Sequence, residues 1–153
     1  QNERKRPAPQ SFSIILFDID QFKRLNDNHG HDFGDRVLAR ISDIIAGRMR
    51  GGDLVVRYGG EEICVVVADS LARNAARVAD DIRQQVEGEP FEFGGERVVV
   101  TVSAGVAESS PDAPNLYSVL RKADEALYEA KGAGRNNVRL FGLPQLPVQD
   151  AGK

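Results

Sequence analysis

The strongest constraint on the fold is a continuous apolar run near the start of the chain, SFSIILFDID at residues 11–20. Its large apolar side chains are Phe12, Ile14, Ile15, Leu16 and Phe17. Because these side chains do not alternate with polar ones, and two are β-branched, the run is typical of a strand buried on both faces. The strand is expected to end at Asp18 and Asp20.

Four helices are expected after this strand in the sequence. Their approximate ranges are 20–28, 33–49, 71–86 and 116–131, the last three with apolar residues near the 3.6-residue period. Gly30 is expected to end the first of them, and Asp69 or Ser70 to cap the third.

Glycine pairs mark two hairpins. LVVRY and EICVVVA are strands joined across Gly59 and Gly60, and FEFGGERVVVTVSAGVA is a second hairpin that leads into a long buried strand. NVRLF is expected to be the final strand. The resulting order, β-α-α-β-β-α-β-β-α-β, predicts an α/β (α+β) domain with a mixed, mainly antiparallel central sheet flanked by helices.

The 153 residues are expected to form one domain over 11–142, after a linker or helix end at 1–10 and before a flexible tail at 143–153. A net charge of −3 argues against binding of a nucleic acid polymer. No apolar run is long enough to span or contact a membrane. With one cysteine and no signal peptide, the segment is expected to be cytoplasmic, alone or as part of a larger, even membrane-anchored, protein.

Three carboxylates are the first candidates for chemistry. Glu61 and Glu62 lie at the tip of the first hairpin, and Asp18 ends the first strand. If the hairpin lies beside that strand, these carboxylates converge near the carbonyl of Ile19. Hard oxygen ligands of this kind suit Mg²⁺, and Mn²⁺ can replace it.

The alternative is structural, because glutamates at turns are usually only solvated and an aspartate after a strand is often a helix cap. Gly59 and Gly60 would let a phosphate or a base approach the backbone closely. His29 and His31 offer too few ligands for zinc. Cys64, within ICVVV, is interpreted as a core residue.

Four segments together resemble the GGDEF family, the diguanylate cyclases, over about residues 12–141. They are FDIDQFKRLNDNHGHDFGD at 17–35, RYGGEEI at 57–63, TVSAGVA at 101–107 and RKADEALYEAKGAGRNNV at 121–138. The resemblance implies a fold similar to the palm domain of nucleotide cyclases and polymerases, which agrees with the element order.

The resemblance also implies roles for individual residues. Asp18, the Ile19 carbonyl and Glu61 match Mg²⁺ ligands, and Glu62 matches a carboxylate that helps to hold a second metal ion. The residues that match positions around the nucleotide are Asn26 and Asp35 for guanine, His31 near the substrate, Phe22 and Lys23 beside the phosphates, and Lys131 and Arg135 at the terminal phosphates. Lys131 and Arg135 are four apart near a helix end, so both are expected to face one anion; the alternative is a solvated helix end.

The implied reaction joins two GTP molecules into cyclic di-GMP and releases two pyrophosphates. Lys23 would offset charge in the transition state, and Glu61 would help to deprotonate the attacking hydroxyl. Because one domain offers one GTP site, turnover is expected to need a homodimer. Control is then expected from an N-terminal regulatory domain in the full-length protein.

RGGD at residues 50–53 matches the family's R-x-x-D inhibitory site, so Arg50 and Asp53 are expected to bind product; a surface ion pair is the alternative. A further family arginine would fall near Asp81, with Arg77 and Arg83 nearby. The rival functions are a catalytically silent domain that binds GTP or cyclic di-GMP, and a different purine nucleotide cyclase or polymerase-like palm.

Overall fold

The computed structural model describes residues 11–142. Its central sheet has the strand order β2-β3-β1-β6-β7. The strands are β1 (Phe12–Ile19), β2 (Leu54–Arg57), β3 (Glu62–Ala68), β6 (Val102–Glu108) and β7 (Val138–Leu140). Every pairing is antiparallel except that of β6 with β7. The predicted fold class, with a mixed and mainly antiparallel sheet, is confirmed.

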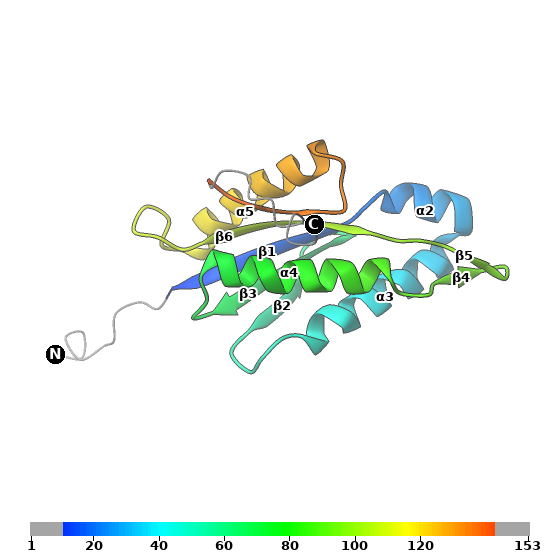
Figure 1. Ribbon diagram of the computed structural model, residues 1–153, viewed down its shortest axis with the longest axis horizontal. Helices are drawn as coiled ribbons and strands as arrows, with labels where there is room; N and C mark the ends of the chain where they lie inside the picture. Colours follow the sequence, from blue (N-terminus) through cyan, green and yellow to red (C-terminus); the bar gives the residue numbers. More distant parts are fainter. Residues whose placement is uncertain (1–10, 143–153) are drawn as a thin grey trace, which may run out of the picture.

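Four helices accompany the sheet within the described residues: α2 (Phe22–His29), α3 (His31–Gly47), α4 (Ala72–Glu87) and α5 (Leu116–Gly132). Figure 1 shows α4 lying along one face of the sheet and α5 on the opposite side. Gly30, at φ 91°, ends α2 as the sequence predicts. No helix in this part of the chain has the length and apolar character needed to cross a bilayer.

Strand β1 is buried on both faces, as predicted. Ile15, Phe17 and Ile19 belong to a large core that they share with α3 and α4. Ile14 and Leu16 belong to a second core that is completed by α5. Successive side chains of a strand point to opposite faces, so odd-numbered positions of β1 face α3 and α4 while even-numbered ones face α5.

The second predicted hairpin is shorter than expected. It consists of β4 (Glu92–Phe93) and β5 (Glu96–Arg97), which form a separate two-stranded sheet. The long strand begins only at Val102, which pairs with Ile19 at the end of β1. Beyond this pair the Asp20 N–H donates to Thr101 O at 2.9 Å, and the Val98 N–H donates to Phe91 O at 2.9 Å. The chain then leaves β1 for α2, so the segment between Val98 and Thr101 has no strand to pair with.

The predicted cap of α4 was wrong. The N-cap position is Leu71, which has no capping side chain, and Asp69 and Ser70 lie before it. The backbone N–H of Ala72 instead donates to Glu108 Oε1 of β6, at 2.6 Å. A distant strand therefore supplies the acceptor that a local cap usually provides. The predicted linker at 1–10 and tail at 143–153 lie outside the described residues.

Candidate active site

The site begins where β1 meets β3. The antiparallel register places Asp18 directly opposite Glu62. Both side chains lie on the α5 face of the sheet, because Asp18 follows Leu16 by two positions and Glu62 precedes Cys64 by two. The RYGGEEI hairpin therefore lies beside β1, which is the condition for the carboxylates to meet.

Lys131, in the last turn of α5, completes this group. Its Nζ donates to Asp18 Oδ2 at 2.5 Å, and Asp18 is only 3% exposed. Partial burial opposes the lysine charge, but the hydrogen bond to Asp18 and the negative charges of Asp18, Glu62 and Glu61 outweigh it and raise the pKa of the ammonium group. The site thus holds a positive charge on a buried carboxylate.

The ionised form of Glu62 is destabilised by this arrangement. Burial, and then the charge of Asp18, raise the pKa of the Glu62 carboxyl above its ordinary value, and the opposing effect of Lys131 is smaller. The ionised form of Glu62 is therefore less favourable in the folded protein than in the unfolded chain.

The predicted metal ligands are only partly assembled. Glu61 lies in the hairpin, and its backbone oxygen accepts from the Ile19 N–H at 3.1 Å. Within residues 11–142 no group of three or more His, Cys, Asp or Glu side chains is arranged to hold a metal ion. The donor set nevertheless fits Mg²⁺, because its ligands are hard oxygens and the ammonium group of Lys131 is a cation bound to one of them.

A second part of the candidate site lies between α2 and α3. The Oδ1 atom of Asn26 is buried and has no hydrogen-bond partner among the described residues. It lies against the Cα of Gly34, where an added Cβ would stand 1.8 Å from it. A buried, unpaired acceptor is costly, so it is a feature that a bound ligand would explain. Asp35 follows Gly34 on α3 and is exposed.

The remaining predicted nucleotide contacts are mostly exposed. His31 begins α3, and Phe22 packs against the large core at the start of α2. Lys23 forms an i,i+4 ion pair with Asp27 at 3.3 Å, and its side chain is 90% exposed. It can therefore move toward a ligand at little cost.

Gly59 and Gly60 are not required by the hairpin itself. Neither has a positive φ, and a Cβ on Gly60 would meet nothing within 4 Å. A Cβ on Gly59 would make only ordinary contacts, the nearest at 3.7 Å to Glu62. Conformation and packing among the described residues therefore both tolerate a side chain at these two positions.

Lys131 and Arg135 do not lie on the same helix. Helix α5 ends at Gly132, and Arg135 has the left-handed φ of 64°. The spacing of four residues therefore does not place the two side chains on one helix face. Glycines 132 and 134 allow the chain to leave the helix before Arg135.

The turn after α5 is anchored by a hydrogen-bond network that was not predicted from the sequence. Asp20 accepts from the hydroxyls of Thr101 and Ser103, both at 2.7 Å, and from the Asn136 N–H at 3.0 Å. Asn136 is itself left-handed, at φ 50°, and also bonds Arg83 and Glu87 of α4. The only local signal was the second aspartate of FDID, whose partners lie more than 80 residues away.

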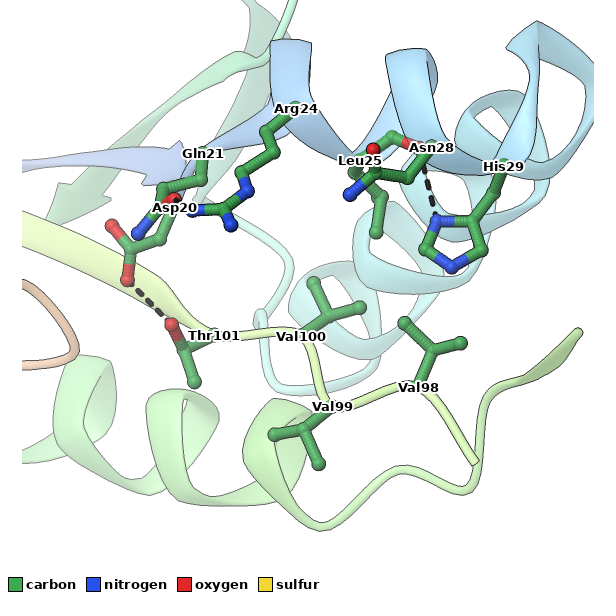
Figure 2. Close-up of a pocket in the computed structure, with 10 residues that line it drawn as sticks. All are labelled: Asp20, Gln21, Arg24, Leu25, Asn28, His29, Val98, Val99, Val100 and Thr101. Carbon is green, nitrogen blue, oxygen red and sulfur yellow. Dashed lines mark hydrogen bonds between the residues drawn. The ribbon is translucent and has the colours of Figure 1, made fainter. Parts of the chain in front are cut away.

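A cavity of about 260 Å³ lies between α2 and residues 98–101. Figure 2 shows Arg24, Asn28 and His29 of α2 facing residues 98–101 across it. None of the predicted site residues lines this cavity, although Asp20 does. Neither the Asp18–Glu62 carboxylate pair nor Asn26, with its unpaired Oδ1, lines this cavity.

The RGGD turn has a local structural role. Asp53 Oδ2 accepts from the Arg50 N–H at 2.9 Å, and Asp53 Oδ1 accepts from the Ala68 N–H at 3.1 Å. The carboxylate therefore stabilises the turn and ties it to the end of β3. Asp81 pairs with Arg48 at 3.2 Å, and Arg83 pairs with Asp80 at 2.7 Å.

Cys64 lies in the second core and is 8% exposed. Burial raises the pKa of its thiol to about 11, so the neutral form dominates at physiological pH. This confirms its interpretation as a core residue.

The raised pKa of Glu62 leads to a stability prediction. A carboxyl whose pKa is higher in the folded state binds its proton more tightly there, so stability is lost as the pH rises above 4.5, its ordinary value, through the folded-state pKa. Glu62→Gln is expected to raise the melting temperature at pH 7 by about 1–4 °C. Thermal unfolding followed by circular dichroism should show the gap to wild type closing toward pH 4.5.

The control for this measurement is Glu125→Gln, on the exposed face of α5. It should leave the melting temperature unchanged at every pH. A Glu62→Gln protein that is less stable than wild type at pH 7 would contradict the conclusion that ionised Glu62 destabilises the folded protein.

Comparison with known proteins extends these observations. The model of the family described as diguanylate cyclase, GGDEF domain, matches residues 1–137. The response regulator PleD of Caulobacter vibrioides is 43% identical over 128 residues, which is 82% of this chain but 28% of that protein. The chain thus spans less than a third of this relative's length.

Solved structures show the same fold. The active GGEEF domain of a diguanylate cyclase from Vibrio cholerae has a TM-score of 0.82 at 32% identity, covering 93% of this chain and 88% of that one. The GGDEF domain of DgcB from Caulobacter crescentus, in complex with c-di-GMP, has a TM-score of 0.80 at 33% identity, covering 85% and 77%. With its family match, its carboxylate hairpin beside β1 and this shared fold, the chain belongs to the GGDEF domain family of diguanylate cyclases.

Proposed function

We propose that this domain is an active diguanylate cyclase that condenses two GTP molecules into cyclic di-GMP and two pyrophosphates. The observation that carries the proposal is the pair of carboxylates, Asp18 and Glu62, at the end of the central strand with a cation bound to one of them. Carboxylates in this position suit a magnesium ion that shares its shell with nucleotide phosphates. Membership of the GGDEF family supports the same reaction.

Guanine would be recognised between α2 and α3. A donor on the purine edge would satisfy the buried Oδ1 of Asn26. Asp35 would accept from the N1–H and the amino group of guanine. Adenine lacks this donor pair and would leave the two acceptors unpaired, so we expect GTP to be strongly preferred over ATP.

The chain's own groups would share the remaining work. Bound Mg²⁺, held by Asp18, Glu61, Glu62 and the Ile19 carbonyl, would stabilise the attacking and leaving oxygens. Glu61 would accept the proton of the 3′-hydroxyl, and Lys23 would offset negative charge in the transition state.

The other predicted contacts would position the nucleotide. Phe22 would lie beside the phosphates, and His31 would lie near the substrate. Lys131 and Arg135 would hold the terminal phosphates. Gly59 and Gly60 would allow the nucleotide to lie close to the hairpin backbone.

Each domain would present one GTP, so two domains would have to face each other about a two-fold axis. The similar DgcB domain was solved with c-di-GMP. Arg50 and Asp53 are the residues through which product would inhibit this domain, with Asp53 also holding its own turn.

The test is incubation with GTP and Mg²⁺ at several protein concentrations, followed by chromatography of the nucleotides. Cyclic di-GMP should form with a rate that rises more steeply than the protein concentration. The double variant Glu61→Ala/Glu62→Ala should lose at least about 10³-fold of the activity, because it removes two groups on which the transferring phosphate depends.

The matched control is Glu92→Ala/Glu96→Ala, which removes two exposed glutamates from the β4–β5 hairpin. It should retain wild-type activity. If wild type stays inactive even when a coiled coil at the N-terminus enforces dimers, yet still binds GTP or cyclic di-GMP, the domain is a silent nucleotide receptor.

A further inference from the structure

The ion pair between Lys131 and Asp18 differs from the other ion pairs in the described part of the chain. Its carboxylate side chain is 4% exposed, whereas the next most buried partner carboxylate, that of Glu89, is 19% exposed. The pair joins the end of α5 to the end of β1 across 113 positions of sequence. A buried carboxylate needs a counter-charge, so this contact matters more than a surface ion pair.

The lysine occupies the place where a metal ion would act. Asp18 and Glu62 face each other in register, and the ammonium group stands on an oxygen of Asp18. It also lies in the field of Glu62 and Glu61, which stabilises its charge. A divalent cation on the same carboxylates would meet this positive charge at close range, and repulsion between them would be strong in a partly buried site.

The lysine can also leave. Its side chain is 36% exposed, in contrast to the aspartate, and its four-carbon stem allows the ammonium group to swing without a change in the backbone. It lies in the last turn of α5, just before Gly132.

We propose that Lys131 is a resident counter-ion that holds the metal position on Asp18 in the nucleotide-free protein and exchanges it for a phosphate when a nucleotide brings in the metal. The proposal rests on the function proposed above. Two ion pairs replace one in this exchange, since Asp18 gains a divalent cation and Lys131 gains an anionic partner. A metal ion alone would displace the lysine without giving it a new partner. The nucleotide-free site should therefore bind divalent metal weakly.

Mn²⁺ is a suitable probe, because the free ion can be measured by electron paramagnetic resonance during titration without nucleotide. Lys131→Met removes the competing charge and keeps the side-chain length, so it should bind Mn²⁺ at least about tenfold more tightly than wild type. Lys122→Met, on the same helix with its ammonium group over the ring of Phe141, is the matched control and should resemble wild type. Adding Asp18→Asn to the Lys131→Met protein should abolish the gain.

The wild-type protein provides a second measurement that does not depend on the folding of a variant. Nuclear magnetic resonance of ¹⁵N-labelled lysine should show a protected ammonium signal for Lys131. This signal should persist in millimolar Mg²⁺ and shift when Mg²⁺ is added with a non-hydrolysable GTP analogue. Loss of the signal with Mg²⁺ alone would overturn the proposal. An unshifted signal with the analogue bound would overturn it as well.

The outcomes separate this inference from the proposed function. Equal Mn²⁺ affinity in wild type and Lys131→Met, with the GTP analogue still bound, would refute the counter-ion role and leave the cyclase proposal intact. Failure of wild type to bind the analogue at all would count against both. Tighter Mn²⁺ binding in Lys131→Met, with the expected shift in the wild-type spectrum, would support the exchange.

Discussion

Replacing Gly105 with alanine is expected to destabilise the domain severely. An added Cβ would lie 2.1 Å from the carbonyl oxygen of Ala123 and 2.3 Å from the backbone nitrogen of Leu127. Gly105 lies in β6, two positions from Ala107, and so faces α5. The absence of a side chain is what lets the helix backbone approach the sheet.

The cost follows from what the new methyl group would meet. Overpacking usually costs about 1–3 kcal/mol when side chains can rearrange. Here the obstacles are backbone atoms, so α5 would have to move as a unit and carry Lys131 away from Asp18. We expect a loss of at least about 3 kcal/mol, a large part of a typical domain's 5–15 kcal/mol.

Urea unfolding of Gly105→Ala, followed by circular dichroism, measures this directly. Gly132→Ala is the control, because it lies at the end of α5 with open space around it and no positive φ. It should be neutral or slightly stabilising. A Gly105→Ala protein within about 1 kcal/mol of wild type would show that α5 can withdraw at little cost.

Replacing Gly34 with alanine is expected to weaken nucleotide binding strongly while leaving the fold largely intact. The new Cβ would stand 1.8 Å from Asn26 Oδ1, so the amide would have to rotate away. Asn26 is the candidate partner of guanine, and its displacement would leave the base edge and Asp35 misaligned. We expect GTP affinity to fall by roughly 10²-fold or more, as when a buried polar contact to a substrate is lost.

Stability should change much less than affinity. The clash is with a side chain that can move, and alanine favours a helix interior over glycine by about 1 kcal/mol. Gly47→Ala, in the same helix with nothing within 4 Å of the position that its new methyl group would take, is the matched control and should bind GTP normally. Calorimetric titration with a non-hydrolysable analogue distinguishes them, and equal affinities would remove Asn26 from the site.

Much of the fold was accessible from local pattern. The unbroken apolar run of β1 predicted burial on both faces. The structure confirms it, because Ile15 lies in the core on one face of the sheet and Ile14 in the core on the other. Helical periodicity located α3, α4 and α5 to within a few residues. Where prediction failed, a distant partner was responsible. Glu108 replaces the expected local cap of α4, and the end of β1 limits where β6 can begin.

The candidate site also has features that the sequence predicted and features that it did not. The order of the motifs, through the family resemblance, predicted roles for Asp18, Asn26 and the hairpin glutamates, and the structure places Asp18 opposite Glu62. The spacing of Lys131 and Arg135 does not by itself bring them together, since the helix that carries Lys131 ends at Gly132. The Asp20 network was missed, because the partners of its carboxylate are brought together only when β6 and the turn after α5 pack beside β1.

The family, the alternation of strands and helices, and the residue types available for chemistry could be read from the amino-acid sequence, because they depend on periodicity and on short motifs. Which charged side chains come into contact depends on how the chain packs in three dimensions. Lys131 reaches Asp18 because Gly105 lets α5 settle closely on the sheet, and Glu62 faces the same aspartate because β3 pairs with β1 in one register. Such contacts join residues far apart in the chain, so their energies arise from packing and burial, which no local pattern contains.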